Sequence, residues 1–369
     1  MNTYNPFPTS IADIEARIQH IDPVKYASSR NFKDGALTYL SPYISRGVIS
    51  TKQVFDYIKS LELPWNATEK LVQELAWRDY WQQVWIAKGD QIEGDLKNNQ
   101  TPVSNFEIPE AILKAETNIR VVDNAIKQLY ETGYMHNHMR MYVASICCNI
   151  AQSHWLQPAK WMYSHLLDGD LASNYLSWQW VAGAFSNKKY YANQQNINKY
   201  FNSDQTGTML DVEYDEFEQM PIPESLLKSA PFTEETVLPG SDSVVLDRNK
   251  TTVIYNYYNI DPNWYASKDV QRVLLLEPSF FKKYPVSKKC LDFVLELAKN
   301  IEGMIFFSGE FQELESQVSS SLLIYKEHPT NTHYTGSQKP RDWMAGTSGY
   351  FPSFFAFWKK YKKELKSNY

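Results

Sequence analysis

The chain has 369 residues, of which 43% are hydrophobic and 15% aromatic, so it can bury a large core and is long enough for two domains. A net charge of -5 excludes a strong overall positive field, and any contact with nucleic acid must therefore rely on a local patch. Cys147, Cys148 and Cys290 match neither a disulfide framework nor a metal-ligand spacing, so we expect a cytoplasmic protein without a metal. The N-terminus shows no signal peptide, and no membrane-spanning segment is expected.

The chain from about Ile11 to Asn202 is predicted to be mostly helical. The clearest helix is Thr68–Ala87, in which tryptophans recur at every fourth position. The other predicted helices are Ser10–Ile21, Ser50–Leu61, Val121–Glu131, Met135–Ile150, Pro158–Leu167 and Leu171–Ala182. No strand with two-residue alternation is expected among them.

The composition changes after the polar run Asn193–Gln205. Residues 220–243 are rich in proline, which resists regular structure, and are interpreted as a linker. Beyond them, apolar runs of strand length alternate with helical patterns, which predicts a small parallel sheet. The strands are Arg272–Glu277, Gly303–Phe307 and Ser321–Tyr325, and the helices are Val286–Asn300 and Glu310–Ser319. The tail Phe354–Leu365 is interpreted as an aromatic docking helix with a solvated basic end.

We therefore predict three parts of the chain. Residues 1–219 form a helical domain, residues 220–243 form the proline-rich linker, and residues 244–369 form a smaller α/β domain whose role the sequence does not assign.

Two otherwise apolar segments, Thr132–Met141 and Leu167–Trp180, carry polar residues that need partners when they are buried. Taken alone, the Asp-Gly-Asp sequence at residues 168–170 has a simpler interpretation, namely a helix N-terminal cap together with an ion pair between Arg140 and an aspartate. The two segments together indicate a ligand site. In each segment, residues at helical spacing would lie on one helix face, and the two faces would close on one planar ligand. Those residues are Asn137 and Met141 in one segment, and Asp170, Asn174 and Trp178 in the other.

These motifs resemble the FAD-binding domain of the DNA photolyase and cryptochrome family. In chain order the similar segments are Tyr26, Arg30–Phe32, Thr38–Tyr43, Glu74–Tyr80, Thr132–Met141, Asp168–Asn174 and Ser177–Trp180. The resemblance implies a mostly α protein, with a helical FAD-binding domain followed by the C-terminal α/β domain. The family's N-terminal antenna domain is not expected, and no antenna chromophore is assigned.

The resemblance implies FAD as the cofactor. The residues expected at its phosphates are Tyr26, Thr38, Leu40 and Ser41, and those expected at its ring are Arg140, Asp168, Asp170 and Asn174, the last facing N5. Trp178 and Trp155 match the first two members of the family's electron-transfer chain. The segment where a third tryptophan is usual contains only Phe106, so either the chain ends through Trp161 or Tyr134, or photoreduction is poor.

The resemblance also implies a pocket for a cyclobutane pyrimidine dimer. Aromatic faces would stack on the flipped bases, while a carboxyl and an amide would bond their polar edges. The matching residues are Glu74, Trp77, Asn137, Met141 and Trp180. The expected DNA phosphate contacts are Arg30, Arg78, His138 and Gln205, with Arg78 alternatively pairing with Glu74 along the helix. Two residues depart from the family pattern: His138 stands where arginine is common, and Leu71 where tryptophan is frequent.

The first functional hypothesis is a photolyase-like lyase that repairs damaged DNA under blue light, with catalysis assigned to Glu74, Asn137, Met141, Asn174, Trp155 and Trp178. The alternative is a cryptochrome-like photoreceptor that signals to a protein partner, favoured by His138 and the acidic net charge. A third possibility is a flavoprotein that has lost its light function.

Overall fold

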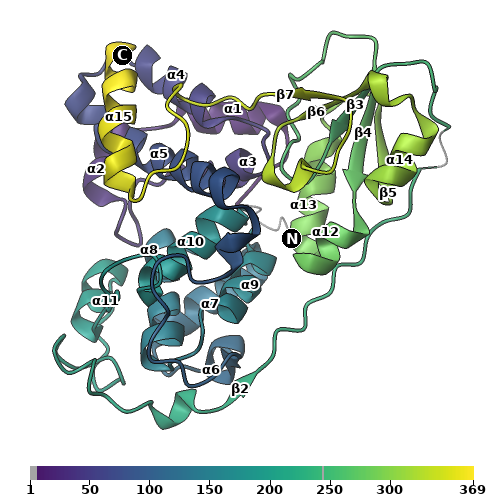
Figure 1. The fold of residues 1–369 in the computed structure, drawn as a ribbon. Coiled ribbons are helices and arrows are strands. Elements are labelled where there is room, and N and C mark those ends of the chain that lie inside the picture. The colour runs from purple at the N-terminus through teal and green to yellow at the C-terminus, as the bar shows by residue number, and fades with distance from the viewer. Residues whose placement is uncertain (1–5, 243–244) are drawn as a thin grey trace, which may run out of the picture. The chain divides into compact units, whose positions relative to one another are not determined.

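The structure is a computed structural model that describes residues 6–242 and 245–369 (Figure 1). It divides into two compact units, and each is described by itself. The sheet unit comprises the described parts of Met1–Pro23, Thr38–Ala87 and Glu234–Tyr369, and the helical unit comprises Val24–Leu37 and Lys88–Thr233. These units interleave along the chain, whereas the predicted domains follow one another. The division into 1–219, 220–243 and 244–369 stays a prediction.

The sheet unit contains five parallel strands in the order β5-β4-β3-β6-β7. The three predicted strands lie within two residues of β4 (Gln271–Leu276), β5 (Met304–Ser308) and β6 (Leu323–Lys326). The prediction missed the central strand β3 (Thr252–Tyr255) and the edge strand β7 (Ser337–Lys339). Every residue of β3 is buried, so the strand lacks the alternation that marks a half-exposed strand, while β7 is short and polar.

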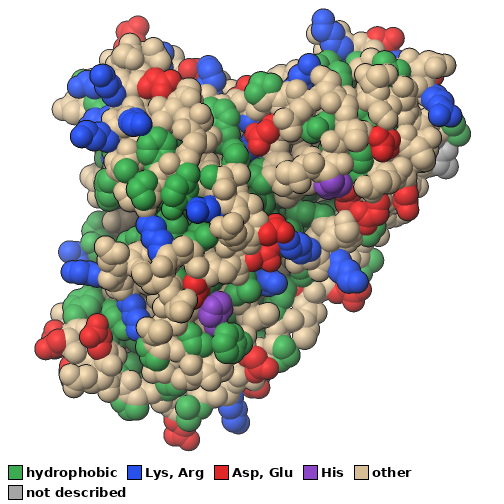
Figure 2. Space-filling view, in the orientation of Figure 1, with side chains coloured by type: hydrophobic (Ala, Val, Ile, Leu, Met, Phe, Trp, Pro, Cys, Tyr) green, Lys and Arg blue, Asp and Glu red, His purple; other side chains and the backbone are tan. Residues whose placement is uncertain are grey.

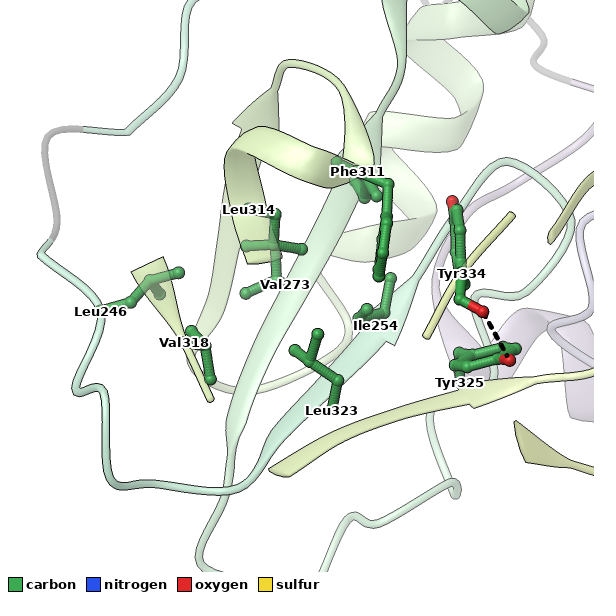
Figure 3. Packing of buried hydrophobic residues seen from close by; sticks show 10 residues of the cluster. Leu246, Ile254, Val273, Phe311, Leu314, Val318, Leu323, Tyr325 and Tyr334 are labelled. Atoms are coloured by element: carbon green, nitrogen blue, oxygen red, sulfur yellow. Dashed lines mark hydrogen bonds between the residues drawn. The ribbon is translucent and has the colours of Figure 1, made fainter. Parts of the chain in front are cut away.

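Helices α12 (Pro278–Lys283), α13 (Lys288–Ala298) and α14 (Phe311–Gln317) connect the strands. In Figure 3 the side chains of Phe311 and Leu314 on α14 lie over the sheet residues Ile254 and Val273, with which they form a buried cluster. The Tyr325 hydroxyl closes one end of this cluster by donating to the Tyr334 carbonyl oxygen at 3.1 Å. Apolar contact with α14 therefore covers one face of the sheet.

The same unit contains helices from the start of the chain: α1 (Ile11–Gln19), α3 (Ser41–Ser45), α4 (Thr51–Ser60) and α5 (Trp65–Lys88). Ser10 caps α1, and Ser50 caps α4 in a capping box with Gln53. The predicted helices Ser10–Ile21, Ser50–Leu61 and Thr68–Ala87 agree with α1, α4 and α5 to within three residues at each end.

The C-terminal helix α15 (Phe354–Ser367) packs on α5. The ring of Phe354 stacks on Trp77 with centroids 3.6 Å apart, and the Tyr361 hydroxyl donates to Asp79 at 2.5 Å. The opposite side of α15 exposes Lys359 and Lys363, and basic side chains gather over this helix in Figure 2. The prediction of a docking helix with a solvated basic end is confirmed.

The helical unit is built from α2 (Pro23–Ser29), α6 (Glu110–Leu113), α7 (Arg120–Thr132), α8 (Asn137–Ser145), α9 (Leu156–His165), α10 (Leu171–Ala182) and α11 (Gln194–Phe201). The predicted helix Met135–Ile150 is α8 continued by a π-helical turn at Ile146–Ile150. Residues 220–243, predicted to resist regular structure, form a 3-10 turn at Glu224–Leu226 and one short strand. The short strand that lies among the helices before residue 202 is only two residues long and shows no two-residue alternation. Two-residue strands β1 (Ile108–Pro109) and β2 (Ser229–Ala230) pair antiparallel, because even a short contact satisfies backbone groups of both segments.

Candidate functional site

An ion pair between α8 and the loop before α10 forms the centre of the candidate site. The Arg140 Nη2 atom lies 2.9 Å from Asp168 Oδ2, and the side chains are 20% and 6% exposed. Arg140 Nε also donates to the Met135 carbonyl oxygen at 2.8 Å, which fixes the guanidinium. The second carboxylate oxygen, Asp168 Oδ1, is buried without a hydrogen-bond partner. An additional N–H or O–H donor would therefore fit beside this pair.

Helix α10 carries the other polar groups predicted at the ring. Asp170 caps the helix, with its Oδ1 accepting from the Ser173 N–H at 2.7 Å, so the capping interpretation is correct. Asn174 is one turn further along and donates through Nδ2 to the Ala159 carbonyl oxygen at 2.8 Å. The Ser173 Oγ atom is buried without a partner. Ser173 Oγ and Asp168 Oδ1 thus each have unused hydrogen-bonding capacity, which fits a polar ligand such as a flavin.

The four residues predicted at the FAD phosphates divide between the units. Tyr26 lies on α2 in the helical unit, whereas Thr38, Leu40 and Ser41 lie at the start of α3 in the sheet unit. The backbone turns sharply there, because Tyr39 has a left-handed φ of 52°. The Leu40 N–H points to Thr38 Oγ1 at 3.5 Å, so the hydroxyl and this N–H are neighbours.

The predicted lesion-binding residues of the sheet unit lie on α5. Glu74 is 28% exposed and pairs with Lys70 at 2.8 Å along the helix. Trp77 is half-buried, with Phe354 stacked on its ring. Arg78 is also half-buried and follows directly. All three thus come from one stretch of helix.

The predicted lesion-binding residues of the helical unit lie on α8 and α10. Asn137 is exposed in the first turn of α8, and Met141 is half-buried one turn later. Trp180 is 37% exposed near the end of α10 and contacts the ring of Tyr190. An exposed amide and a partly exposed indole are available for a ligand, since the core does not enclose them.

The two histidines of this segment have structural contacts. His136 Nδ1 accepts from the His138 N–H at 3.1 Å and caps α8, and burial lowers the pKa of His136 to about 4. His138 lies between the rings of Tyr142 and Tyr200 with Nδ1 3.1 Å from the Asn31 carbonyl oxygen. Burial lowers the pKa of His138 as well, so both imidazoles are neutral at neutral pH and bring no positive charge to a phosphate.

The remaining predicted DNA contacts also have bonds within the helical unit. Gln205 accepts from the Arg120 N–H at 2.9 Å and donates to the Asn118 carbonyl oxygen at 2.7 Å. Arg30 donates to the Ala27 carbonyl oxygen at 3.1 Å. Their roles at DNA stay predictions.

Both predicted members of the electron-transfer chain are buried. Trp178 is 2% exposed on α10, and Trp155 is fully buried just before α9. The Trp155 indole N–H donates to Asp95 Oδ1 at 2.6 Å. The sequence analysis missed Asp95, because it lies 60 residues from Trp155 and no local spacing links the two.

Asp79 is a second carboxylate that the sequence analysis left without a role. It accepts from Thr51 Oγ1 at 2.9 Å and from Tyr361 of α15, and it is 4% exposed. Burial raises the pKa of Asp79 to about 6, against the opposing effect of these hydrogen bonds. Its position inside the Glu74–Tyr80 motif was a signal, but the partner on α15 could not be found from spacing.

Residues 71–225 match the family described as the FAD binding domain of DNA photolyase. This part of the chain belongs to the photolyase and cryptochrome family. Membership of the family implies FAD as the cofactor.

The proteins similar to this chain include both photolyases and cryptochromes. A deoxyribodipyrimidine photo-lyase of Streptomyces griseus is 33% identical over 149 residues, which are 40% of this chain and 32% of that protein. A cryptochrome DASH of Synechocystis sp. is 29% identical over 182 residues, which are 47% of this chain and 37% of that protein. The chain thus spans about a third of the length of the curated relatives it matches.

Two solved structures align with about half of this chain. A cryptochrome of Synechocystis sp. aligns with a TM-score of 0.48 at 26% identity, covering 53% of this chain and 44% of that one. A class III photolyase of Agrobacterium tumefaciens aligns with a TM-score of 0.46 at 26% identity, covering 52% of this chain and 41% of that one.

Within residues 6–242 and 245–369, no helix is both long enough and apolar enough to cross a lipid bilayer. Over the same residues, no three His, Cys, Asp or Glu side chains gather as a metal site would require.

Proposed function

We propose that this protein is a blue-light-driven flavoprotein that repairs cyclobutane pyrimidine dimers in DNA. The observation that carries the proposal is the buried Arg140–Asp168 pair with its open carboxylate oxygen, inside the segment that matches the FAD-binding domain. Relatives named deoxyribodipyrimidine photo-lyase support assignment to the carbon–carbon lyases. We place the protein in the cytoplasm, with which its three buried free cysteines are compatible.

The chain's own residues would hold and orient the cofactor. Arg140, Asp168 and Asp170 would bind the polar edge of the flavin ring, and the Asn174 amide would lie near N5. Tyr26, Thr38, Leu40 and Ser41 would bind the phosphates through hydroxyl and N–H groups. Reduced FAD, when bound, supplies the electron on absorbing blue light.

A second group of residues would hold the lesion. Trp77 and Trp180 offer aromatic surfaces on which flipped bases can stack. Glu74 and Asn137 offer a carboxyl and an amide for base edges, and Met141 offers a polarisable apolar contact. Arg30 and Arg78 would contact phosphates with charge, whereas neutral His138 and Gln205 could only offer hydrogen bonds.

Trp178 and Trp155 would return the cofactor to its reduced state by passing electrons inward. Both indoles are shielded from water, which limits side reactions of their oxidised forms.

The alternative is a cryptochrome-like photoreceptor that acts on a protein partner without repairing DNA. The buried, neutral state of His138 favours it, since a family arginine at this position would carry a permanent charge. Cryptochromes are also among the relatives.

The deciding experiment is repair of a defined substrate. Protein loaded with FAD and chemically reduced is illuminated with blue light in the presence of single- or double-stranded oligonucleotides that carry one thymine dimer. We expect restored thymines in the light and none in the dark, measured by chromatography. Glu74→Gln should lower the yield per absorbed photon and leave the bound FAD unchanged.

The outcome that overturns repair is equally clear. If FAD binds and is photoreduced while the dimers persist on both substrates, the photoreceptor alternative replaces the proposal.

A further inference from the structure

Asp95 is held against the indole of Trp155 by a network that leaves neither side chain free to turn. Its Oδ1 accepts from Trp155 Nε1 at 2.6 Å, and its Oδ2 accepts from the Gln100 N–H at 2.7 Å. The Gln100 side chain in turn accepts from the Trp155 backbone N–H at 2.9 Å and donates to the Ser153 carbonyl oxygen at 2.8 Å. A carboxylate fixed on an indole N–H is a charge-assisted hydrogen bond.

A route from this pair to water is present on the same side. The Asp95 side chain is 15% exposed, and His154 Nε2 lies 3.5 Å from its Oδ1. The His154 ring stacks on Phe106, which is 67% exposed. Phe106 lies in the segment where a third tryptophan is usual in the family, and a benzene ring is much harder to oxidise than an indole.

One-electron oxidation of Trp155 would create a cation inside the protein. Trp155 is completely buried, and an unneutralised charge there is costly. Oxidation also makes an indole N–H strongly acidic, and the atom that already accepts this hydrogen bond is a carboxylate oxygen. Moving the proton along that bond would remove both charges at once, which is favourable where water is excluded.

We propose that the electron-transfer chain ends at Trp155 and that Asp95 accepts the proton that the oxidised indole releases; this rests on the proposed function. One electron leaves Trp155 through Trp178 to the photoexcited flavin, which is the oxidant. The indole N–H bond breaks and an O–H bond forms on Asp95 Oδ1, leaving a neutral indole radical and a neutral carboxylic acid. An external reductant such as a thiol later gives one electron to the indole radical and releases its own proton to water, while the proton on Asp95 Oδ1 returns to the indole nitrogen.

The test uses Asp95→Asn, which keeps the size and one of the two accepting oxygens but cannot take up the proton. The wild-type and variant proteins, loaded with oxidised FAD, are followed by transient absorption after a blue flash. In the wild type we expect the neutral tryptophan radical, formed more slowly in D₂O than in H₂O. In Asp95→Asn we expect the radical cation instead, at an unchanged initial rate, with charge recombination at least about tenfold faster, equivalent to about 1.4 kcal/mol.

A second measurement does not depend on photochemistry. The indole N–H resonance of Trp155 is observed by NMR in the dark protein and assigned with Trp155→Phe. Asp95→Asn should move this resonance upfield, because an amide oxygen accepts more weakly than a carboxylate. Asp123→Asn is the matched control, since Asp123 accepts from the Thr117 N–H and hydroxyl in the same unit and does not touch Trp155.

The outcomes separate the two proposals. If wild-type protein forms no tryptophan radical, the electron-transfer part of the proposed function fails. If the radical forms but Asp95→Asn changes neither its protonation state nor the Trp155 resonance, only the role of Asp95 is wrong. If Trp161→Phe or Tyr134→Phe abolishes the long-lived radical while Asp95→Asn does not, the chain ends at that residue instead.

Discussion

Asp168 shows how one residue connects the packing of the helical unit with its proposed chemistry. One carboxylate oxygen neutralises Arg140, and the other is buried and open. A fold selected for stability alone would satisfy that oxygen internally, because an unpaired buried acceptor is destabilising by about 1–3 kcal/mol. The motif was sufficient to predict the Arg140–Asp168 pair, whereas the open oxygen required the structure.

Asp168→Asn tests this residue. The amide has a similar size but leaves the mostly buried Arg140 without its counter-charge, so we expect an unfolding free energy lower by about 1–3 kcal/mol and a marked loss of bound FAD. Urea unfolding and visible absorbance per protein measure the two effects. Asp123→Asn should lower stability and retain FAD; equal FAD loss in both variants would refute a specific role for Asp168.

At the scale of elements, α5 and α15 form a buried contact through Asp79. A carboxyl whose pKa is raised from 3.8 to about 6 keeps its proton in the folded protein at a pH where the unfolded chain has lost it. The folded state therefore binds more protons between about pH 4 and pH 6, and the free energy of unfolding falls as pH rises through this window. The docking of α15 is thus strongest in mild acid.

Asp79→Asn should remove this pH dependence, since an amide does not titrate. Relative to the variant, wild-type protein should lose up to about 3 kcal/mol of unfolding free energy between pH 4 and pH 7. Denaturant unfolding of both proteins across this range measures the difference. A constant difference between the two curves would show that Asp79 stays ionised throughout.

At the scale of the whole molecule, the sheet unit joins the beginning and the end of the chain. Helix α5 buries Tyr80 and Trp81, and Tyr80 contacts Phe354 and Phe357 of α15. Helix α5 belongs to the stretch predicted as a flavin domain, yet residues after 244 cover its aromatic side. A segment that is continuous in sequence need not be an independent folding unit.

A fragment of residues 1–243 should therefore fail to fold cooperatively, because it would expose the aromatic side of α5. We expect a weak near-ultraviolet circular dichroism signal and rapid amide hydrogen exchange in α5. Co-expression with residues 244–369 is the control and should restore both signals. Cooperative unfolding of the fragment alone, with FAD bound, would instead support the predicted domain boundary.

The sequence by itself determined the long helices, three of the five strands of the parallel sheet and the family motifs, because helical periodicity and motif spacing are local properties of the chain. It also indicated that Arg140, Asp168 and Asp170 serve one ligand. Only the tertiary structure decided the central place of β3, the docking of α15 on α5 and the contact of Asp95 with Trp155. Each of these depends on residues far apart in sequence, which are brought together by packing and hydrogen bonding and which no local pattern records.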